Sequence, residues 1–224
     1  MKTINKNSTK AEVLEAVKQD GYWLQYASEE LRGDKEVVLA AVSQNGWALQ
    51  YASEELMADR AVVLAAVQQY GVALKCASKE LRCDKEIVLE AVKRNGEALY
   101  YARCELCGDK QIVLAAVKQN GAALRYASKR FRGDRDFMLE VVTENWLTLE
   151  YASAEFKDDK EVVLAAVKQN GFALEYASDE LRGDREVVMA AVKQNGWALD
   201  YASDELRCEI LACWVNAIEQ GLVN

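Results

Sequence analysis

The chain contains no histidine and no proline, and it has no apolar run long enough to span a membrane. Without histidine it lacks the most frequent general base and the commonest metal ligand. Because the chain has no proline, collagen-like and polyproline structures are excluded. The 224 residues are nevertheless 51% hydrophobic and 29% charged, which is enough apolar material for a sizeable core. These features exclude fibrous and disordered classes and disfavour histidine-based catalysis.

The sequence is instead built on a tandem repeat with a period of 25 residues. One leucine column and one valine column, starting at Leu24 and Val17, recur eight times without exception. Aspartate fills a third column, in which Thr9 stands one period before the first aspartate: Asp34, Asp59, Asp84, Asp109, Asp134, Asp159 and Asp184. The period predicts a polar lead-in over 1–8, one solenoid domain of eight units over 9–208, and a C-terminal segment over 209–224.

Each unit is predicted to contain two helices. Asp34 is a suitable N-cap, and the apolar run Val37–Val42 follows it. Asn45-Gly46 is expected to end this helix, with the glycine in the left-handed conformation. A shorter helix should follow, with Ser53 capping its closing turn. A unit of this size cannot hold a core alone, so the pattern predicts an all-α fold, an α-solenoid of eight 25-residue two-helix repeats.

The two ends of the array depart from the repeat. Trp23 replaces an alanine of the consensus, as expected for a face that has no preceding unit. The segment 209–224 retains apolar residues at Leu211, Trp214, Val215 and Ile218, and we expect it to form a C-terminal capping helix. Residues 1–8 are polar, expected to fray, and lack a signal-peptide pattern, which leads us to expect a cytoplasmic protein without membrane contact.

The repeat resembles a known family. The stretch DKEVVLAAVSQNGWALQYAS at Asp34–Ser53 is similar to the short helical repeat known as domain of unknown function 4116, and the resemblance covers residues 9 to about 208. That family carries no established activity. The resemblance therefore implies tandem helical repeats and adds little about mechanism.

Variable columns on an exposed face are where a repeat protein can carry a binding surface. Positions 47, 50 and 54 are three and four residues apart, which predicts one shared face of the second helix. Aromatic and basic side chains recur in these columns, and such residues are typical binding anchors, although drift on a solvated face is the alternative. With the anomalous Trp146 of the sixth unit added, the predicted partner-binding residues are Tyr22, Trp47, Tyr100, Arg125, Lys129, Trp146, Phe172 and Trp197.

Charge is distributed unevenly along the chain, whose formal net charge is −8. Residues 93–135 carry 10 basic and 4 acidic side chains, whereas residues 136–224 carry 7 basic and 18 acidic ones. A basic band with nearby tyrosines suits single-stranded nucleic acid, and an acidic region can mimic a polyanion. Because acidic surface flanks the basic band, we favour a protein or peptide partner, or self-association, over nucleic acid.

In the sixth unit Trp146, which follows Asn145, stands in the column that is glycine in the other units. The same part of the chain also carries Phe131, Phe137 and Phe156. Either these bulky residues pack together and alter the local curvature, or Trp146 is exposed and anchors a partner.

Cysteines offer a further candidate site. Cys104 and Cys107 form a CxxC pair, and Cys83 lies one unit earlier. These thiols are either free or able to bind a metal. With no second CxxC pair we expect free thiols, no metal and no cofactor. The sequence thus predicts a non-catalytic interaction scaffold, with nucleic-acid binding or polyanion mimicry as alternatives.

Overall fold

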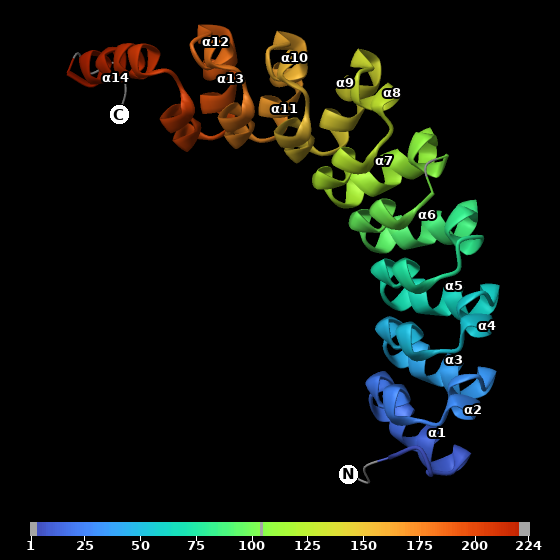
Figure 1. Cartoon of the computed structure of the whole chain (residues 1–224). Coiled ribbons are helices and arrows are strands. Elements are labelled where there is room, and N and C mark those ends of the chain that lie inside the picture. The colour runs from blue at the N-terminus through green and yellow to red at the C-terminus, as the bar shows by residue number, and fades with distance from the viewer. Residues whose placement is uncertain (1–3, 104, 220–224) are drawn as a thin grey trace. The chain divides into compact units, whose positions relative to one another are not determined.

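The computed structural model describes residues 4–103 and 105–219, with side chains up to residue 216. All regular structure in these ranges is helical, as predicted. The chain divides into two compact units, residues 1–128 and 129–224. In both units the repeats follow one another as stacked rungs (Figure 1).

Each repeat begins with a ten-residue α-helix whose N-cap is an aspartate, or Thr9 in the first repeat. In α3, the Oδ1 atom of Asp34 accepts the backbone N–H groups of Glu36 and Val37 at 3.0 and 3.2 Å. The long helices are α1 Lys10–Gln19, α3 Lys35–Gln44, α5 Arg60–Gln69, α6 Lys85–Arg94, α7 Lys110–Gln119, α9 Arg135–Glu144, α11 Lys160–Gln169 and α13 Arg185–Gln194.

The predicted second helix is resolved as two separate elements. The first is a six-residue 3₁₀ helix, capped by the asparagine or aspartate before it in all but one of the described repeats. These helices are η1 Gly21–Tyr26, η2 Gly46–Tyr51, η3 Gly71–Cys76, η5 Gly96–Tyr101, η7 Gly121–Tyr126, η8 Trp146–Tyr151, η9 Gly171–Tyr176 and η10 Gly196–Tyr201.

An extended alanine, such as Ala52 with ψ near 162°, ends each 3₁₀ helix, and one further helical turn closes the repeat. These closing turns are α2 Glu29–Arg32, α4 Glu54–Met57, η4 Leu81–Cys83, η6 Leu106–Gly108, α8 Lys129–Arg132, α10 Ala154–Lys157 and α12 Asp179–Arg182. In the last repeat the corresponding turn continues as α14 Asp204–Glu219.

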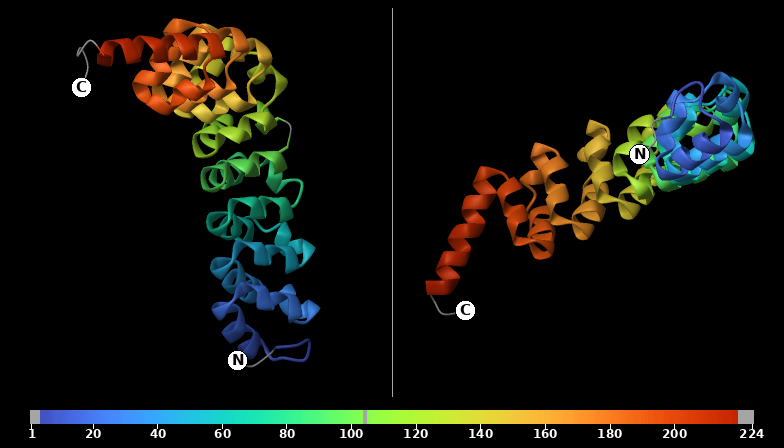
Figure 2. Two further views of the ribbon diagram at one scale, coloured as in Figure 1. Left: turned by 90° about the vertical axis from the view of Figure 1, so that its left-hand side faces the viewer. Right: turned by 90° about the horizontal axis from the view of Figure 1, so that it is seen from below.

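The core lies between stacked long helices and the row of 3₁₀ helices. In the second repeat Val37, Val38, Val42 and Leu49 are fully buried, and the equivalent valine and leucine columns are buried in the other described repeats, except at Val192 in the last. Each long helix packs on the next within a unit, and Figure 2 (left) shows the rungs of residues 1–128 one above another. No repeat could bury these side chains alone, so stacking creates the core.

The glycine after the asparagine is required by stacking and not, as predicted, by a left-handed backbone. None of six glycines of this column has a φ in the left-handed range: Gly21, Gly46, Gly71, Gly96, Gly171 and Gly196. A Cβ atom on Gly46 would overlap the carbonyl oxygen of Ala66 in the next repeat, and Gly21, Gly71, Gly96 and Gly171 meet the equivalent carbonyl. Only a residue without a side chain permits this close approach.

A glutamine amide from the next repeat completes this contact. Gly171 donates its N–H to Oε1 of Gln194 at 2.6 Å, and Nε2 of the same side chain donates to the Gln169 carbonyl at 3.2 Å. The same N–H to glutamine bond joins Gly21 to Gln44 and Gly96 to Gln119. The amide therefore satisfies two backbone groups that the helix ends would otherwise leave unpaired.

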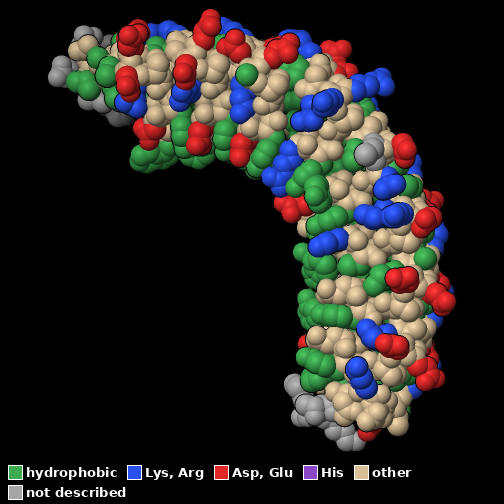
Figure 3. Space-filling model, viewed as in Figure 1, with side chains coloured by type: hydrophobic (Ala, Val, Ile, Leu, Met, Phe, Trp, Pro, Cys, Tyr) green, Lys and Arg blue, Asp and Glu red, His purple; other side chains and the backbone are tan. Residues whose placement is uncertain are grey.

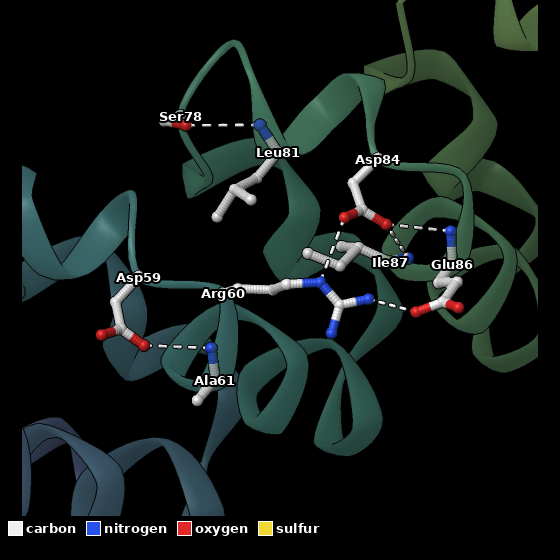
Figure 4. Close-up of polar contacts among 8 residues, drawn as sticks. All are labelled: Asp59, Arg60, Ala61, Ser78, Leu81, Asp84, Glu86 and Ile87. Atoms are coloured by element: carbon white, nitrogen blue, oxygen red, sulfur yellow. Dashed lines mark hydrogen bonds and ion pairs between the residues drawn. The ribbon is translucent and has the colours of Figure 1, made fainter.

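An ion-pair ladder links the starts of successive long helices. The basic residue that begins one helix contacts the capping aspartate of the next repeat, as Lys35 does with Asp59 at 2.6 Å. Arg60 bonds both Asp84 and Glu86, while Asp84 also accepts backbone N–H groups of its own helix (Figure 4). Equivalent pairs are Lys10–Asp34, Lys85–Asp109, Arg135–Asp159 and Lys160–Asp184.

These contacts hold the aspartate pKa values below their ordinary range. For Asp59 the hydrogen bond from Lys35 is the largest cause, and Asp34, Asp109, Asp159 and Asp184 follow the same pattern. At Asp84 burial pushes the pKa up, but the N–H of Ile87 and the Arg60 guanidinium outweigh it. The charged carboxylates therefore favour the folded chain.

The two ends differ from the prediction. Ile4 is buried, and Ser8 donates its N–H to the Asn5 carbonyl at 2.9 Å, so the described part of the lead-in forms a turn. Trp23 is half-buried against Tyr26, their ring centroids 5.6 Å apart. At the other end α14 begins at Asp204 and not at 209. Its Leu211, Trp214 and Val215 are exposed, while Ile218 lies outside the described side chains.

We predict that Gly46→Ala lowers the free energy of unfolding by about 1–3 kcal/mol, because the new Cβ overlaps the Ala66 carbonyl. Gly196→Ala is the matched control, since nothing lies within 4 Å of a Cβ at this position. Urea unfolding of both variants measures the difference. Equal unfolding midpoints would contradict the assigned role of the glycine.

We also predict that lowering the pH from about 5 to 2 lowers the urea midpoint, because carboxylates with depressed pKa values stabilise the fold only while charged. Their contribution is complete above the unfolded pKa and disappears as the pH falls through the folded pKa. Asp59→Asn, which keeps an oxygen for the cap but cannot titrate, should show a smaller pH effect. The same slope in both proteins would show that the ladder aspartates are not responsible.

Candidate interaction surface

The row of 3₁₀ helices presents the predicted aromatic residues. With three residues per turn, Trp47 and Gln50 lie on one outward ridge of η2, while Ala48 and Leu49 point into the core. In Figure 3 hydrophobic side chains gather along one side of each unit, opposite the side that carries α2 and α4 in one unit and α10 and α12 in the other. We call these ridges, one on each 3₁₀ helix, the 3₁₀ row.

The third predicted column is not part of this ridge. Glu54 belongs to α4, because the extended Ala52 separates α4 from η2. Lys129 occupies the same column and is exposed on α8. The prediction that positions 47, 50 and 54 share one helix face is therefore wrong for the third position, which lies beyond a break in the helix.

Aromatic side chains of the 3₁₀ row lean on rings of the next repeat. Trp47 lies 5.3 Å from Tyr70, between centroids. The recurrent tyrosine at the end of the 3₁₀ helix receives most of the others: Tyr22 against Tyr51 at 6.3 Å, Tyr100 against Tyr126 at 5.1 Å, and Phe172 against Tyr201 at 6.1 Å. Part of each ring therefore serves stacking between repeats, and only the rest is available to a partner.

The most exposed aromatic cluster of residues 4–128 surrounds Tyr100. This side chain is 63% exposed and contacts Tyr101 at 5.0 Å as well as Tyr126. The Arg125 guanidinium lies 4.7 Å from the centre of the Tyr126 ring and 3.8 Å from the Glu97 carboxylate. The cluster combines flat apolar surface with a positioned cation, which is the composition of protein-interaction hot spots.

In residues 129–224 the same row is acidic. Glu150 and Glu175 flank Tyr176, and burial together with these carboxylates raises the pKa of the Tyr176 hydroxyl. Trp197 is 75% exposed at the end of this row, since no later tyrosine of the repeat covers it. The predicted anchors thus face two different electrostatic surroundings in the two units.

Trp146 is half-buried in the position that glycine holds elsewhere. Its backbone N–H still donates to Oε1 of Gln169, the glutamine of the next repeat. This bond is 3.2 Å long, compared with 2.6 Å for the bond from Gly171 to Gln194. Its indole stacks near Tyr176, with centroids 6.4 Å apart. Trp146 is therefore packed against the next repeat rather than fully exposed, and the junction keeps both bonds of Gln169, whose Nε2 donates to the Thr143 carbonyl.

The basic band is divided among several faces of the repeats. Arg125 lies on the 3₁₀ row, Arg94 at the end of a long helix beside Glu90, and Arg135 in the ion-pair ladder with Asp159. A polyanion would have to compete with these carboxylates. Among the described residues no group of three metal-binding side chains is present; Cys104, part of the CxxC pair, lies outside the described residues.

Sequence reasoning missed a series of notches on the side of the closing turns. One notch of about 550 Å³ is lined by Glu29, Arg32, Tyr51 and Glu54, and another of about 430 Å³ includes Cys76 and Arg82. The Nε atoms of Arg32, Arg82 and Arg182 are buried there and have no hydrogen-bond partner. Because these atoms are covered, a ligand in the notch would not reach them.

We predict that Tyr100→Ala changes the free energy of unfolding by about 1 kcal/mol or less, because the ring is mostly in solvent. Leu99→Ala, one residue earlier and fully buried, should cost about 2–5 kcal/mol. Denaturant unfolding of the two variants checks the orientation of η5. A larger loss for Tyr100→Ala would contradict it.

Comparison with known proteins agrees with the repeat. The family model described as "Domain of unknown function (DUF4116)" matches residues 13–57, 59–106, 84–132, 109–157, 134–182 and 159–207. No curated protein and no solved structure matches the chain. In the described residues, no helix has both the length and the apolar character needed to cross a membrane.

Proposed function

The chain belongs to this family of tandem repeats of unknown function, DUF4116, and from this premise we propose that it is a non-catalytic scaffold that binds a protein or peptide segment along the 3₁₀ row. The observation that carries the proposal is the cluster around Tyr100. A 63% exposed tyrosine, two further tyrosine rings and a guanidinium meet on one surface. Exposed aromatic and arginine side chains supply most of the energy at protein interfaces.

The repeat architecture suits this role because, in η5, the residues of the outward ridge lie outside the core. Leu99 and Ala98 of η5 are fully buried, whereas Glu97 and Tyr100 alternate with them on the outside. Side chains at these outward positions can therefore vary without loss of the fold. A partner that lies along several repeats would read a different pair of residues on each one.

We favour a partner that presents aromatic or acidic side chains to the part of the 3₁₀ row between Lys75 and Tyr126. Lys75 and Arg125 are exposed on the row, and Arg125 already has a carboxylate, Glu97, beside it at 3.8 Å. An acidic side chain of a partner would extend this contact. Single-stranded nucleic acid would also use tyrosine and arginine, but it would have to displace the glutamate.

Peptides are first selected from a display library for binding to the unmodified chain. We predict that the double variant Tyr100→Ala, Arg125→Ala binds these peptides at least tenfold more weakly, because it removes ring area and the cation together. Glu54→Ala, exposed on α4, is the matched control and should change nothing. Fluorescence anisotropy measures both affinities. Peptides that bind the double variant unchanged would reject the surface. A labelled single-stranded oligonucleotide is measured in the same way. If it binds more tightly than the peptides and its affinity falls steeply with salt, nucleic acid would be the favoured partner instead.

A further inference from the structure

Among the described residues, nothing covers the stacking surface of the last repeat. In earlier repeats the glycine of this column faces a carbonyl of the next long helix, but nothing lies within 4 Å of a Cβ on Gly196. These glycines are Gly21, Gly46, Gly71, Gly96 and Gly171. Val192 is partly exposed, although the same valine is fully buried in the other repeats. Trp197 is 75% exposed beside this surface.

The helix that follows does not close this surface. In other repeats a residue such as Gly33 ends the closing turn, and the extended Asp34 starts a new helix that folds back on the stack. At the corresponding place Cys208 and Glu209 remain helical, so α14 runs away from α13 (Figures 1 and 2). Glu209 still forms an ion pair with Arg185, and it therefore takes the place of the ladder aspartate. It does not supply the packing that a further long helix would provide.

Exposed apolar side chains concentrate at this end. Of the nine large hydrophobic side chains that are exposed in the described part of the chain, five lie between residues 189 and 215: Met189, Trp197, Leu211, Trp214 and Val215. On α14, Leu211, Trp214 and Val215 have the i, i+3, i+4 spacing of one helical stripe. Leu206 and Ile210, on the neighbouring face, are buried.

Charge distinguishes between possible occupants. Residues 186–219 contain six acidic side chains and two basic ones, Lys193 and Arg207. Arg207 bonds Asp204 of its own helix at 2.6 Å. A second copy placed end to end with this region would bring like charges together. The first repeat is also a poor match, because Thr9 and Ala11 replace the two carboxylates that a preceding basic residue contacts elsewhere.

We propose that the end of the last repeat, formed by Gly196, Trp197 and the stripe on α14, binds an amphipathic helix of a partner protein with a basic polar face. The partner helix occupies the place that the next long helix takes in the other repeats. It brings a small residue against Gly196, apolar residues against Trp197 and Trp214, and lysine or arginine toward Asp200, Asp204 and Glu205. This site is separate from the Tyr100 cluster and does not depend on the function proposed for that cluster.

The test uses two synthetic amphipathic peptides with the same leucine and alanine stripe, one with lysine and one with glutamate on the polar face. Binding is followed by tryptophan fluorescence and by the gain of peptide helicity. The lysine peptide should bind at least tenfold more tightly than the glutamate peptide. Gly196→Leu should weaken the lysine peptide tenfold or more without loss of stability, because this position is open and Trp146 shows that it accepts a side chain.

Gly108→Leu is the matched control, since a Cβ there meets only Ser128, at 3.8 Å or beyond. It should bind the lysine peptide as the unmodified chain does. The double variant Tyr100→Ala, Arg125→Ala should also bind the lysine peptide normally. This result distinguishes the site at Gly196 from the binding surface proposed on the 3₁₀ row, so that either proposal can fail without the other. Unchanged binding to Gly196→Leu, or equal binding of both peptides, would overturn the proposal. A dimer in sedimentation that Gly196→Leu abolishes would overturn it in favour of a second copy.

Discussion

The close approach of a glycine to a carbonyl of the next repeat is the constraint on which the rest of the structure depends. At Gly46 the backbone of η2 lies so near Ala66 that a Cβ would overlap its oxygen. This contact sets the distance between rungs, and the buried valines and Leu49 fill the space that it defines. The ion pair Lys35–Asp59 connects the same two repeats at the starts of their long helices, and at other junctions, such as Gly171–Gln194, a glutamine amide adds a hydrogen bond at the end of the long helix.

The same constraint decides what reaches the surface. Once the glycine edge of a 3₁₀ helix is pressed against the next repeat, the three-residue turn sends positions 47 and 50 outward and positions 48 and 49 inward. Aromatic rings on the outward ridge lean across the junction, as Tyr100 does on Tyr126. Where the junction is altered by Trp146, the glutamine bond lengthens. Where α14 continues in place of a new long helix, Gly196 and Trp197 are left open within the described part of the chain.

The period, the aspartate caps and the buried columns could be predicted from the sequence, because each follows from a local preference or from hydrophobic repetition. The role of Gly46 could not, since Asn-Gly after a helix suggests a left-handed residue, and only the neighbouring repeat reveals the carbonyl. The break at Ala52 was missed because a spacing of three and four residues fits one α-helix as well as a 3₁₀ helix followed by a turn. The apolar residues of 209–224 led us to expect a capping helix, but Leu211, Trp214 and Val215 are exposed, because an apolar stripe does not show which surface covers it.

Hydrogen exchange at single glycine amides tests the stacking account most directly. The Gly171 amide donates to Gln194 across a closed junction, whereas Gly196 occupies the same position at an open one. We predict that the Gly171 amide is protected by several orders of magnitude and that the Gly196 amide exchanges near the rate of an unstructured chain. Equal protection at the two amides would contradict this, because it would show that the bond across the junction is not what protects the Gly171 amide.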